Sequence, residues 1–401
     1  MSLTLRAQNK VFGGLLTKYA FTSEALGGLS ANMNVYVPPQ ASNGAKVPVL
    51  YYLSGLTCTE DNAAQKGHLF GAAADEGLAI VFPDTSPRGA NLPGEDDNWD
   101  FGTGAGFYVN ATKAPWSRHY RMYDHVLREI PAVIEREGLP IDTSRASILG
   151  HSMGGHGALM LYLREPGTFR AASAFSPMSH PTNSSLGQKL INGYLEGGIE
   201  EGKAYDAAEL LSQVDSSRDV HILVDCGLND GFYKDKELQP ESLTEAAKRS
   251  GIDAERVQVR LHEGYDHSCT SKHCLTYRLF CQYLCGRACA LARAVPPRIN
   301  SYACLRRFAD VLLVFALVVV GSVASAVSTA GAGSAAGDDM KRRTSAAGHA
   351  SDRVGASASD SGSIVSHSPD SSSITAILPS LNTIISTMRI DSVAATGAVT
   401  A

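Results

Sequence analysis

The sequence predicts an α/β fold with a mostly parallel central sheet, flanking helices and an antiparallel edge at the N-terminal end. Short apolar runs of strand length recur along the chain, and helix-length segments separate several of them, which is typical of a parallel sheet. With 401 residues, 44% of them hydrophobic and 19% charged, the chain is also long enough to bury a full core. The apolar runs cover residues 49–53, 79–82, 146–149, 171–175, 221–224 and 257–261.

Shorter patterns predict the edge of the sheet and three helices. Three strand-like segments precede the first buried strand, and we expect them to form the antiparallel flank; they cover residues 2–10, 14–21 and 32–37. Pro131 lies inside the first predicted helix and indicates a kink or a break there. The predicted helices cover residues 121–137, 153–164 and 240–250.

Charge and cysteine usage narrow the class of protein. The formal net charge of −5 argues against nucleic-acid binding, which needs a concentrated basic face, so we expect a small-molecule ligand. Of eight cysteines, only Cys58 and Cys226 precede residue 268, which is typical of a reduced cytoplasmic protein. Residues 1–10 lack the apolar run of a secretory signal. The oligomeric state stays open between a monomer and a homodimer.

The composition changes after His267 and predicts four regions. Residues 1–268 form the α/β domain, 269–310 mix cysteines with basic residues, 311–337 carry no charge, and 338–401 are a low-complexity tail that we expect to be disordered. The uncharged region exceeds the roughly 20 residues that cross a bilayer, and basic residues flank it. Its second half consists mostly of small residues. Two interpretations therefore stay open: a tail anchor that associates the protein with a membrane, or a biased tail without a role.

The most informative motif is a Gly-x-Ser-x-Gly pentapeptide that follows an apolar run and precedes a helix-like run. Gly150 and Gly154 are small enough for the chain to turn sharply around Ser152. This is the pattern of a nucleophile elbow, in which a serine is lifted on a strand-to-helix turn. Such pentapeptides also occur as ordinary turns. Ser152 is therefore a candidate nucleophile whose partners must be found.

A serine nucleophile needs an imidazole to accept its proton and a carboxylate to orient that imidazole. In α/β-hydrolases these groups follow in the order serine, acid, histidine, each on a loop after a strand. An acidic turn after residues 221–224 contains Asp230, and the loop after residues 257–261 ends in His267. Asp225 borders its strand, and Asp266 adjoins His267 in sequence, so both suit the acid's role less well than Asp230. His151, His156, His221 and His262 compete with His267 for the role of base.

An acyl-transfer site also needs two backbone amides for the oxyanion. The elbow supplies one from Met153, and the loop after residues 49–53 supplies the second, for which we predict Leu56. Gly55 would let that loop approach the substrate closely. Neither a zinc motif of the HExxH type nor a dinucleotide-binding glycine motif after a strand is present in the sequence, so we predict no metal and no cofactor.

Several motifs together make the sequence similar to the S-formylglutathione hydrolase family, also called esterase D, whose members have the α/β-hydrolase fold. The resemblance extends over about two thirds of the chain and implies the same catalytic set, Ser152, Asp230 and His267, with Leu56 and Met153 as oxyanion donors. The matching segments are 53–60, 83–89, 97–108, 120–123, the elbow GHSMGGHGAL, the acid loop and 263–268.

The resemblance implies a serine thioesterase that releases formate and glutathione from S-formylglutathione in formaldehyde detoxification. It places the family's cysteine near the site at Cys58, and we expect Trp99 and Trp116 to line the groove for the substrate. After Ser268 the sequence departs from the family, as a retained intron or a shifted reading frame would produce. Two alternatives therefore stay open: a carboxylesterase or acyltransferase of the same fold, and an inactive product with an aberrant C-terminus.

Overall fold

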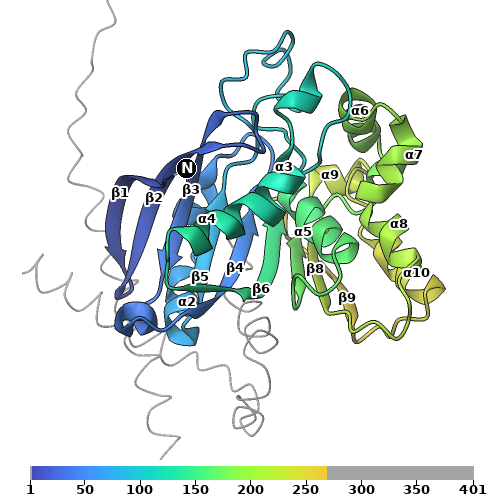
Figure 1. The fold of residues 1–401 in the computed structure, drawn as a ribbon. Helices are drawn as coiled ribbons and strands as arrows, with labels where there is room; N and C mark the ends of the chain where they lie inside the picture. Colours follow the sequence, from blue (N-terminus) through green and yellow to red (C-terminus); the bar gives the residue numbers. More distant parts are fainter. Residues whose placement is uncertain (1, 269–401) are drawn as a thin grey trace, which may run out of the picture. The chain divides into compact units, whose positions relative to one another are not determined.

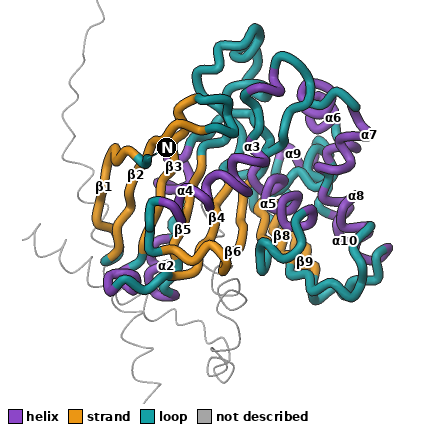
Figure 2. The backbone as a smooth tube through the Cα atoms, viewed as in Figure 1, coloured by secondary structure: helices purple, strands orange, loops and turns teal. Residues whose placement is uncertain are grey.

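The computed structural model describes residues 2–268, and within them the chain folds around one nine-stranded sheet. The strand order is β1-β2-β3-β5-β4-β6-β7-β8-β9. It follows the order of the sequence except that β4 and β5 are exchanged. Figures 1 and 2 show the sheet running across the molecule, with helices packed against it. The predicted α/β-hydrolase class is confirmed.

The N-terminal strands form the predicted antiparallel edge. β1 pairs with β2, β2 with β3, and β3 with β5, all antiparallel. β1 is the outermost strand, and nearly all of its residues are exposed, whereas β3 is mostly buried. The bounds are β1 Thr4–Val11, β2 Gly14–Ser23 and β3 Leu29–Val37.

The remaining strands are parallel and bring their carboxyl ends to the same edge of the sheet, which is where α/β proteins place their sites. The pairs β5 with β4, β4 with β6, and each later neighbouring pair are all parallel. These strands are β4 Val47–Leu53, β5 Ala79–Pro83, β6 Ile141–His151, β7 Ala172–Phe175, β8 Ile222–Gly227 and β9 Val257–His262.

Alternate residues of the central strands pack into two separate hydrophobic cores, one on each face of the sheet. Tyr51 lies in the core that α4 and α5 cover, and its neighbour Tyr52 lies in the core that α1 and α2 cover. Successive side chains of a strand point to opposite faces, so a strand that is buried on both faces reads as a continuous apolar run. That is why residues 49–53 could be recognised from the sequence.

Ten α-helices lie within the described residues. α5 follows the elbow directly and is buried along its whole length except for its last residue. The bounds are α1 Glu60–Lys66, α2 Phe70–Glu76, α3 Met122–Asp124, α4 Ile130–Arg136, α5 Met153–Arg164, α6 Ser185–Tyr194, α7 Gly198–Gly202, α8 Ala207–Ser212, α9 Gly231–Lys234 and α10 Glu241–Arg249.

The predicted helix over residues 121–137 is present in three joined pieces. α3 leads into a π-helical turn, His125–Glu129, and α4 follows at once with Pro131 in its first turn. Pro131 lacks an amide hydrogen, and the first turn of a helix does not need one. The proline therefore begins a new helical piece and does not end the helix.

The predicted C-terminal regions, 269–310, 311–337 and 338–401, lie outside the described residues, and so does the candidate anchor. Among the helices of residues 2–268, none has both the length and the apolar character that a bilayer crossing requires. The four-region division stays a prediction.

Candidate active site

Ser152 occupies a strained turn between β6 and α5. Its φ of 57° and ψ of −121° lie in a region that non-glycine residues rarely adopt. The two motif glycines permit close packing around it, because a Cβ on Gly150 would lie 2.0 Å from the carbonyl oxygen of Gly154, and one on Gly154 would lie 2.0 Å from that of Leu53. The strain thus falls on the serine itself, and the glycines allow the crowded turn to form.

The structure brings together the three side chains that the sequence predicts to be catalytic. The Oγ of Ser152 lies 3.0 Å from Nε2 of His267, and Nδ1 of His267 lies 2.6 Å from Oδ2 of Asp230. The three residues follow β6, β9 and β8 at the carboxyl edge of the sheet. With Nδ1 donating to the carboxylate, Nε2 is left as the acceptor for the serine hydroxyl.

Asp230 is completely buried and is held by the start of α9 as well as by the histidine. Its Oδ1 accepts hydrogen bonds from the amides of Phe232, at 2.9 Å, and Tyr233, at 3.4 Å. Burial alone would raise the pKa of Asp230, but the hydrogen bond and charge of His267, with help from Ser176, hold it below the ordinary value. The carboxylate therefore stays ionised and keeps its orientation.

The two competing acids have other partners. Asp225, at the carboxyl end of β8, accepts a two-point hydrogen bond from Arg260, at 2.7 and 2.6 Å, and lies 2.6 Å from Nε2 of His262. Asp266 is exposed and accepts from the amide and hydroxyl of Ser268, at 2.9 and 2.5 Å. Asp225 thus joins β8 to β9, and Asp266 stabilises its own turn.

The histidines that compete with His267 have other surroundings. Nε2 of His151 lies 2.8 Å from the backbone carbonyl of His267, so the residue before the nucleophile contacts the loop that carries the base. His156 lies within α5, and burial lowers its pKa to about 4, which keeps it neutral. Farther along the chain, His221 lies 3.0 Å from Asp219.

The two predicted oxyanion donors flank the serine. Met153 begins α5, so its amide is one of the free donors at a helix start. The loop with Leu56 passes close by, since a Cβ on Gly55 would lie 3.2 Å from the Cβ of Ser152. Among the residues that the structure describes, neither amide has a recorded acceptor. The assignment of these two amides as oxyanion donors stays a prediction.

The three predicted substrate-binding residues lie in different surroundings. Cys58 is half-buried on the loop of Leu56, and burial raises the pKa of its thiol. Trp99 is 58% exposed, whereas Trp116 is only 8% exposed and packs edge-on against Phe101, Tyr120 and Tyr194. Trp116 thus supports its loop from within and offers little surface to a ligand.

Sequence reasoning did not assign a role to several supporting residues. The ring of Phe232 lies 4.7 Å from that of His267, and the hydroxyl of Tyr108 donates to the carbonyl of Ser54 at 2.8 Å. Arg88 donates to the carbonyl of Cys58 at 2.8 Å. Arg88 and Tyr108 belong to segments that resemble the family, and this was their only sequence signal.

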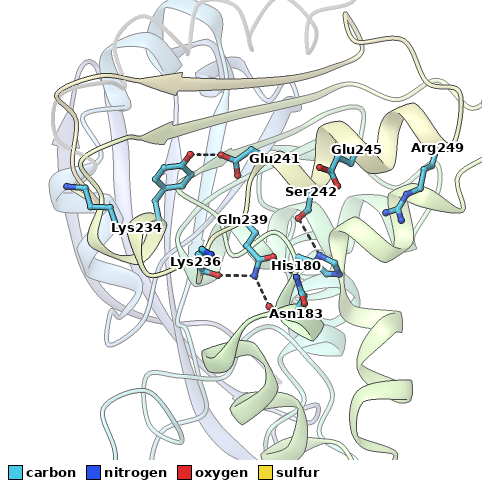
Figure 3. Close-up of a pocket in the computed structure, with 10 residues that line it drawn as sticks. His180, Asn183, Lys234, Lys236, Gln239, Glu241, Ser242, Glu245 and Arg249 are labelled. Atoms are coloured by element: carbon cyan, nitrogen blue, oxygen red, sulfur yellow. Dashed lines mark hydrogen bonds between the residues drawn. The ribbon is translucent and has the colours of Figure 1, made fainter.

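A polar cavity of about 830 Å³ adjoins α9, the helix that Asp230 caps. The hydroxyl of Tyr233 donates to the carboxylate of Glu241, and Figure 3 shows Gln239 bonded to the carbonyl of Asn183. The first of these bonds, 2.5 Å long, ties α9 to α10. None of the three predicted catalytic side chains lines this cavity, so it borders the acid loop from outside.

No group of three or more His, Cys, Asp or Glu side chains within residues 2–268 is placed to hold a metal ion. The hydrogen-bonded serine, histidine and carboxylate are the groups that acyl transfer uses.

Comparisons with known proteins point in the same direction. A family model described as a putative esterase matches residues 23–287. The S-formylglutathione hydrolase of Mus musculus is 47% identical over 268 residues, which make up 67% of this chain and 93% of that protein. The S-formylglutathione hydrolase of Arabidopsis thaliana is 46% identical over 259 residues, 65% of this chain and 89% of that protein.

A solved structure from the same group of enzymes is also similar to this chain in its fold. The S-formylglutathione hydrolase from Agrobacterium tumefaciens is 39% identical and superposes with a TM-score of 0.65. The match covers 71% of this chain and 99% of that one. Sequence and structure thus relate the chain to one family over almost the whole length of its relatives.

Proposed function

The chain belongs to the S-formylglutathione hydrolase family, and we propose that it hydrolyses the thioester S-formylglutathione to formate and glutathione. The observation that carries the proposal is the unbroken hydrogen-bond chain from Ser152 through His267 to Asp230. We place the backbone amides of Leu56 and Met153 beside this series of hydrogen bonds, as oxyanion donors. Acyl transfer requires such an arrangement.

In the first half of the reaction, Ser152 attacks the formyl carbon while its hydroxyl proton passes to Nε2 of His267. Asp230, hydrogen-bonded to Nδ1, stabilises the imidazolium that forms. The amides of Leu56 and Met153 bind the oxyanion. Glutathione leaves as a thiolate that takes up the proton from Nε2 of His267, so the imidazole is neutral again, and the formyl group stays on Ser152 as an ester.

In the second half, a water molecule attacks the formyl ester, and His267 takes a proton from that water. The amides of Leu56 and Met153 bind the second oxyanion in the same way. Collapse of this intermediate releases formate and returns the proton to Ser152. The same three side chains therefore serve both steps, with His267 moving the proton each time.

We assign the walls of the substrate site from exposure. Cys58 lies two residues after Leu56 and borders the position of the thioester, while the exposed indole of Trp99 offers a surface for the peptide arm of the thiol. Trp116 has a packing role. We place the activity in the cytoplasm, where cysteines stay reduced, because the thiols of Cys58 and Cys226 are free.

The first test replaces the nucleophile. We expect Ser152→Ala to lower kcat on S-formylglutathione by at least about 1,000-fold, because the acyl-enzyme cannot form. Circular dichroism and thermal unfolding check that the fold is kept, and Ser144→Ala, at an exposed position near the amino end of β6, serves as the control. Undiminished turnover by Ser152→Ala would contradict the proposal.

A second measurement separates the proposed substrate from the alternative of a general carboxylesterase, which the same fold and triad could support. We expect kcat/KM on S-formylglutathione to exceed that on 4-nitrophenyl acetate by more than about tenfold, a difference of roughly 1.4 kcal/mol in transition-state binding. Equal or reversed values would favour the carboxylesterase. A chain that is inert on both substrates would favour the inactive product.

A further inference from the structure

The loop that carries Leu56 holds a conformation that its own sequence does not favour. Thr57 has a φ of 64°, in the left-handed region that β-branched residues avoid. Such a conformation persists only where the surroundings determine it. The amide of Thr57 donates to the carbonyl of Gly104 at 2.9 Å, and the hydroxyl of Tyr108 holds the carbonyl of Ser54.

The far end of the loop is held by Arg88. Its Nη2 donates to the carbonyl of Cys58 at 2.8 Å, and the hydroxyl of Thr85 donates to the same oxygen at 2.5 Å. Arg88 is itself fixed by the buried carboxylate of Asp84, with Nε 3.0 Å from Oδ2 and Nη2 2.6 Å from Oδ1. The guanidinium therefore joins the loop after β5 to the loop after β4, since it binds both the carboxylate of Asp84 and the carbonyl of Cys58.

We propose that Arg88, held by Asp84, is a positioning residue that sets the place of the Leu56 amide in the oxyanion hole. The peptide of Cys58 is two residues from Leu56, so a shift of its carbonyl is transmitted through the strained Thr57 to the donor. The hydrogen-bond partners of Arg88 are Asp84, Thr85 and the carbonyl of Cys58, and Ser152 is not among them. It acts only through the backbone of this loop, and the inference rests on the proposed role of Ser152 as the nucleophile.

The chemistry of the pair explains why an arginine is needed. A guanidinium presents a planar fork that can bind a carboxylate and a carbonyl at once, whereas a lysine offers one compact charge on a flexible stem. A lysine at position 88 could neutralise Asp84 yet could not fix the Cys58 carbonyl at the same time. Removing the cation entirely would leave the buried carboxylate of Asp84 without its counter-charge, which would destabilise the fold.

The chain contains a second arginine with the same kinds of partner, although its carboxylate, Asp142, is more exposed than Asp84. Arg145 donates to the carboxylate of Asp142 at 2.7 Å and to the carbonyl of Lys46 at 2.9 Å. The two arginines have similar exposure, with 30% of the Arg88 side chain and 40% of the Arg145 side chain accessible. Arg145, however, lies near the amino ends of β4 and β6, at the opposite edge of the sheet from Ser152.

The test compares Arg88→Lys and the double variant Asp84→Asn with Arg88→Gln against the equivalent changes at Asp142 and Arg145. The double variant removes both charges, so no unpaired carboxylate is left. We expect kcat to fall about tenfold in Arg88→Lys and about 100-fold in the double variant, with KM changed less than about threefold, because a misplaced oxyanion donor weakens transition-state binding alone. The variants of the Arg145 pair should keep kcat.

A further measurement separates positioning from loss of stability. The affinity for a trifluoromethyl ketone, which forms a tetrahedral adduct with the serine, should fall in parallel with kcat/KM in the Arg88 variants. Folded Arg88 variants that keep kcat and inhibitor affinity would overturn the proposal, as would an equal loss in the Arg145 variants. The assays use both S-formylglutathione and 4-nitrophenyl acetate. If the wild type acts only on the acetate ester, the proposed substrate is rejected, and the role of Arg88 can still be measured on that ester. If the wild type is inactive on both substrates, both proposals are rejected.

Discussion

At the scale of single residues, the base of the site has supports from three separate segments. Asp230 binds Nδ1 of His267, Phe232 packs against its ring, and His151 contacts its backbone carbonyl. His151 is 116 positions away in sequence and adjoins the nucleophile. The elbow thus contacts the base loop directly, through a hydrogen bond to its backbone.

This contact predicts a graded effect of substitutions at His151. We expect His151→Phe to lower kcat about tenfold, because the base loop loses its link to the elbow and His267 can shift. His151→Gln can place an amide donor near the position of Nε2 and should keep kcat within about threefold. Steady-state kinetics measure both, and His221→Phe is the control. Equal activity of the Phe and Gln variants would show that the contact does not position the base.

Sequence reasoning could select the three proposed catalytic side chains because their order and their places after strands are properties of the chain itself. The supports could not be found in the same way. The contact of His151 with His267 joins positions far apart in sequence, and the positive φ of Thr57 arises from bonds to other loops, since threonine does not favour it. Such features depend on tertiary structure, which no local pattern encodes.

At the scale of secondary-structure elements, the pairing of β8 with β9 decides where the acid and base loops meet. Asp225 on β8 bonds to Arg260 and His262 on β9, next to the ends of both strands. Burial alone would raise the pKa of Asp225, but the hydrogen bonds and charges of these two partners hold it below its ordinary value of 3.8. The ionised carboxylate therefore stabilises the strand pair.

Replacing this carboxylate should reduce stability in a pH-dependent way. Because the folded pKa of Asp225 is lowered, its contribution is fully present above about pH 4 and is lost as the pH falls through the folded pKa. We expect Asp225→Asn to lower the free energy of unfolding by about 2 to 4 kcal/mol at pH 7, since it breaks a buried ion pair. The difference from the wild type should shrink below pH 4.

Urea unfolding at pH 7, 5 and 3.5 measures this difference. Asp142→Asn is the control, because Asp142 also has a lowered pKa, caused mainly by hydrogen bonds from Ser144 and Arg145, but lies at the surface. Its effect should be much smaller at every pH. A difference for Asp225→Asn that stayed constant down to pH 3.5 would mean that the carboxylate's charge does not stabilise the strand pair.

The nine strands and the helices α5 and α10 were predicted from sequence, whereas α6 and several short helices were not. Strands buried on both faces read as continuous apolar runs, and α5 begins at the elbow. By contrast, α7 has five residues bounded by glycines, and α9 has four residues that depend on Asp230 as their cap. Segments of this length carry no periodicity, and tertiary contacts make them helical.

At the scale of the whole chain, the described residues contain all of the proposed machinery. Ser152, Asp230, His267 and both oxyanion donors lie within residues 2–268, and so do the supports of the base. The family match ends at residue 287, and the division between the two units of the chain falls after Ile299. The mouse relative matches this chain over 93% of its own length.

These boundaries predict the effect of a deletion. A chain that ends at Ile299 keeps the whole family match and every residue that the mechanism uses, so we expect its kcat/KM on S-formylglutathione to stay within about twofold of the full chain, less than 0.5 kcal/mol in transition-state binding. Steady-state kinetics and thermal unfolding of both chains, measured side by side, test this. The same deletion in a Ser152→Ala background measures the background rate. A loss of tenfold or more with an unchanged melting temperature would mean that residues 300–401 take part in catalysis, and the mechanism would then need a contribution from beyond the family's usual length.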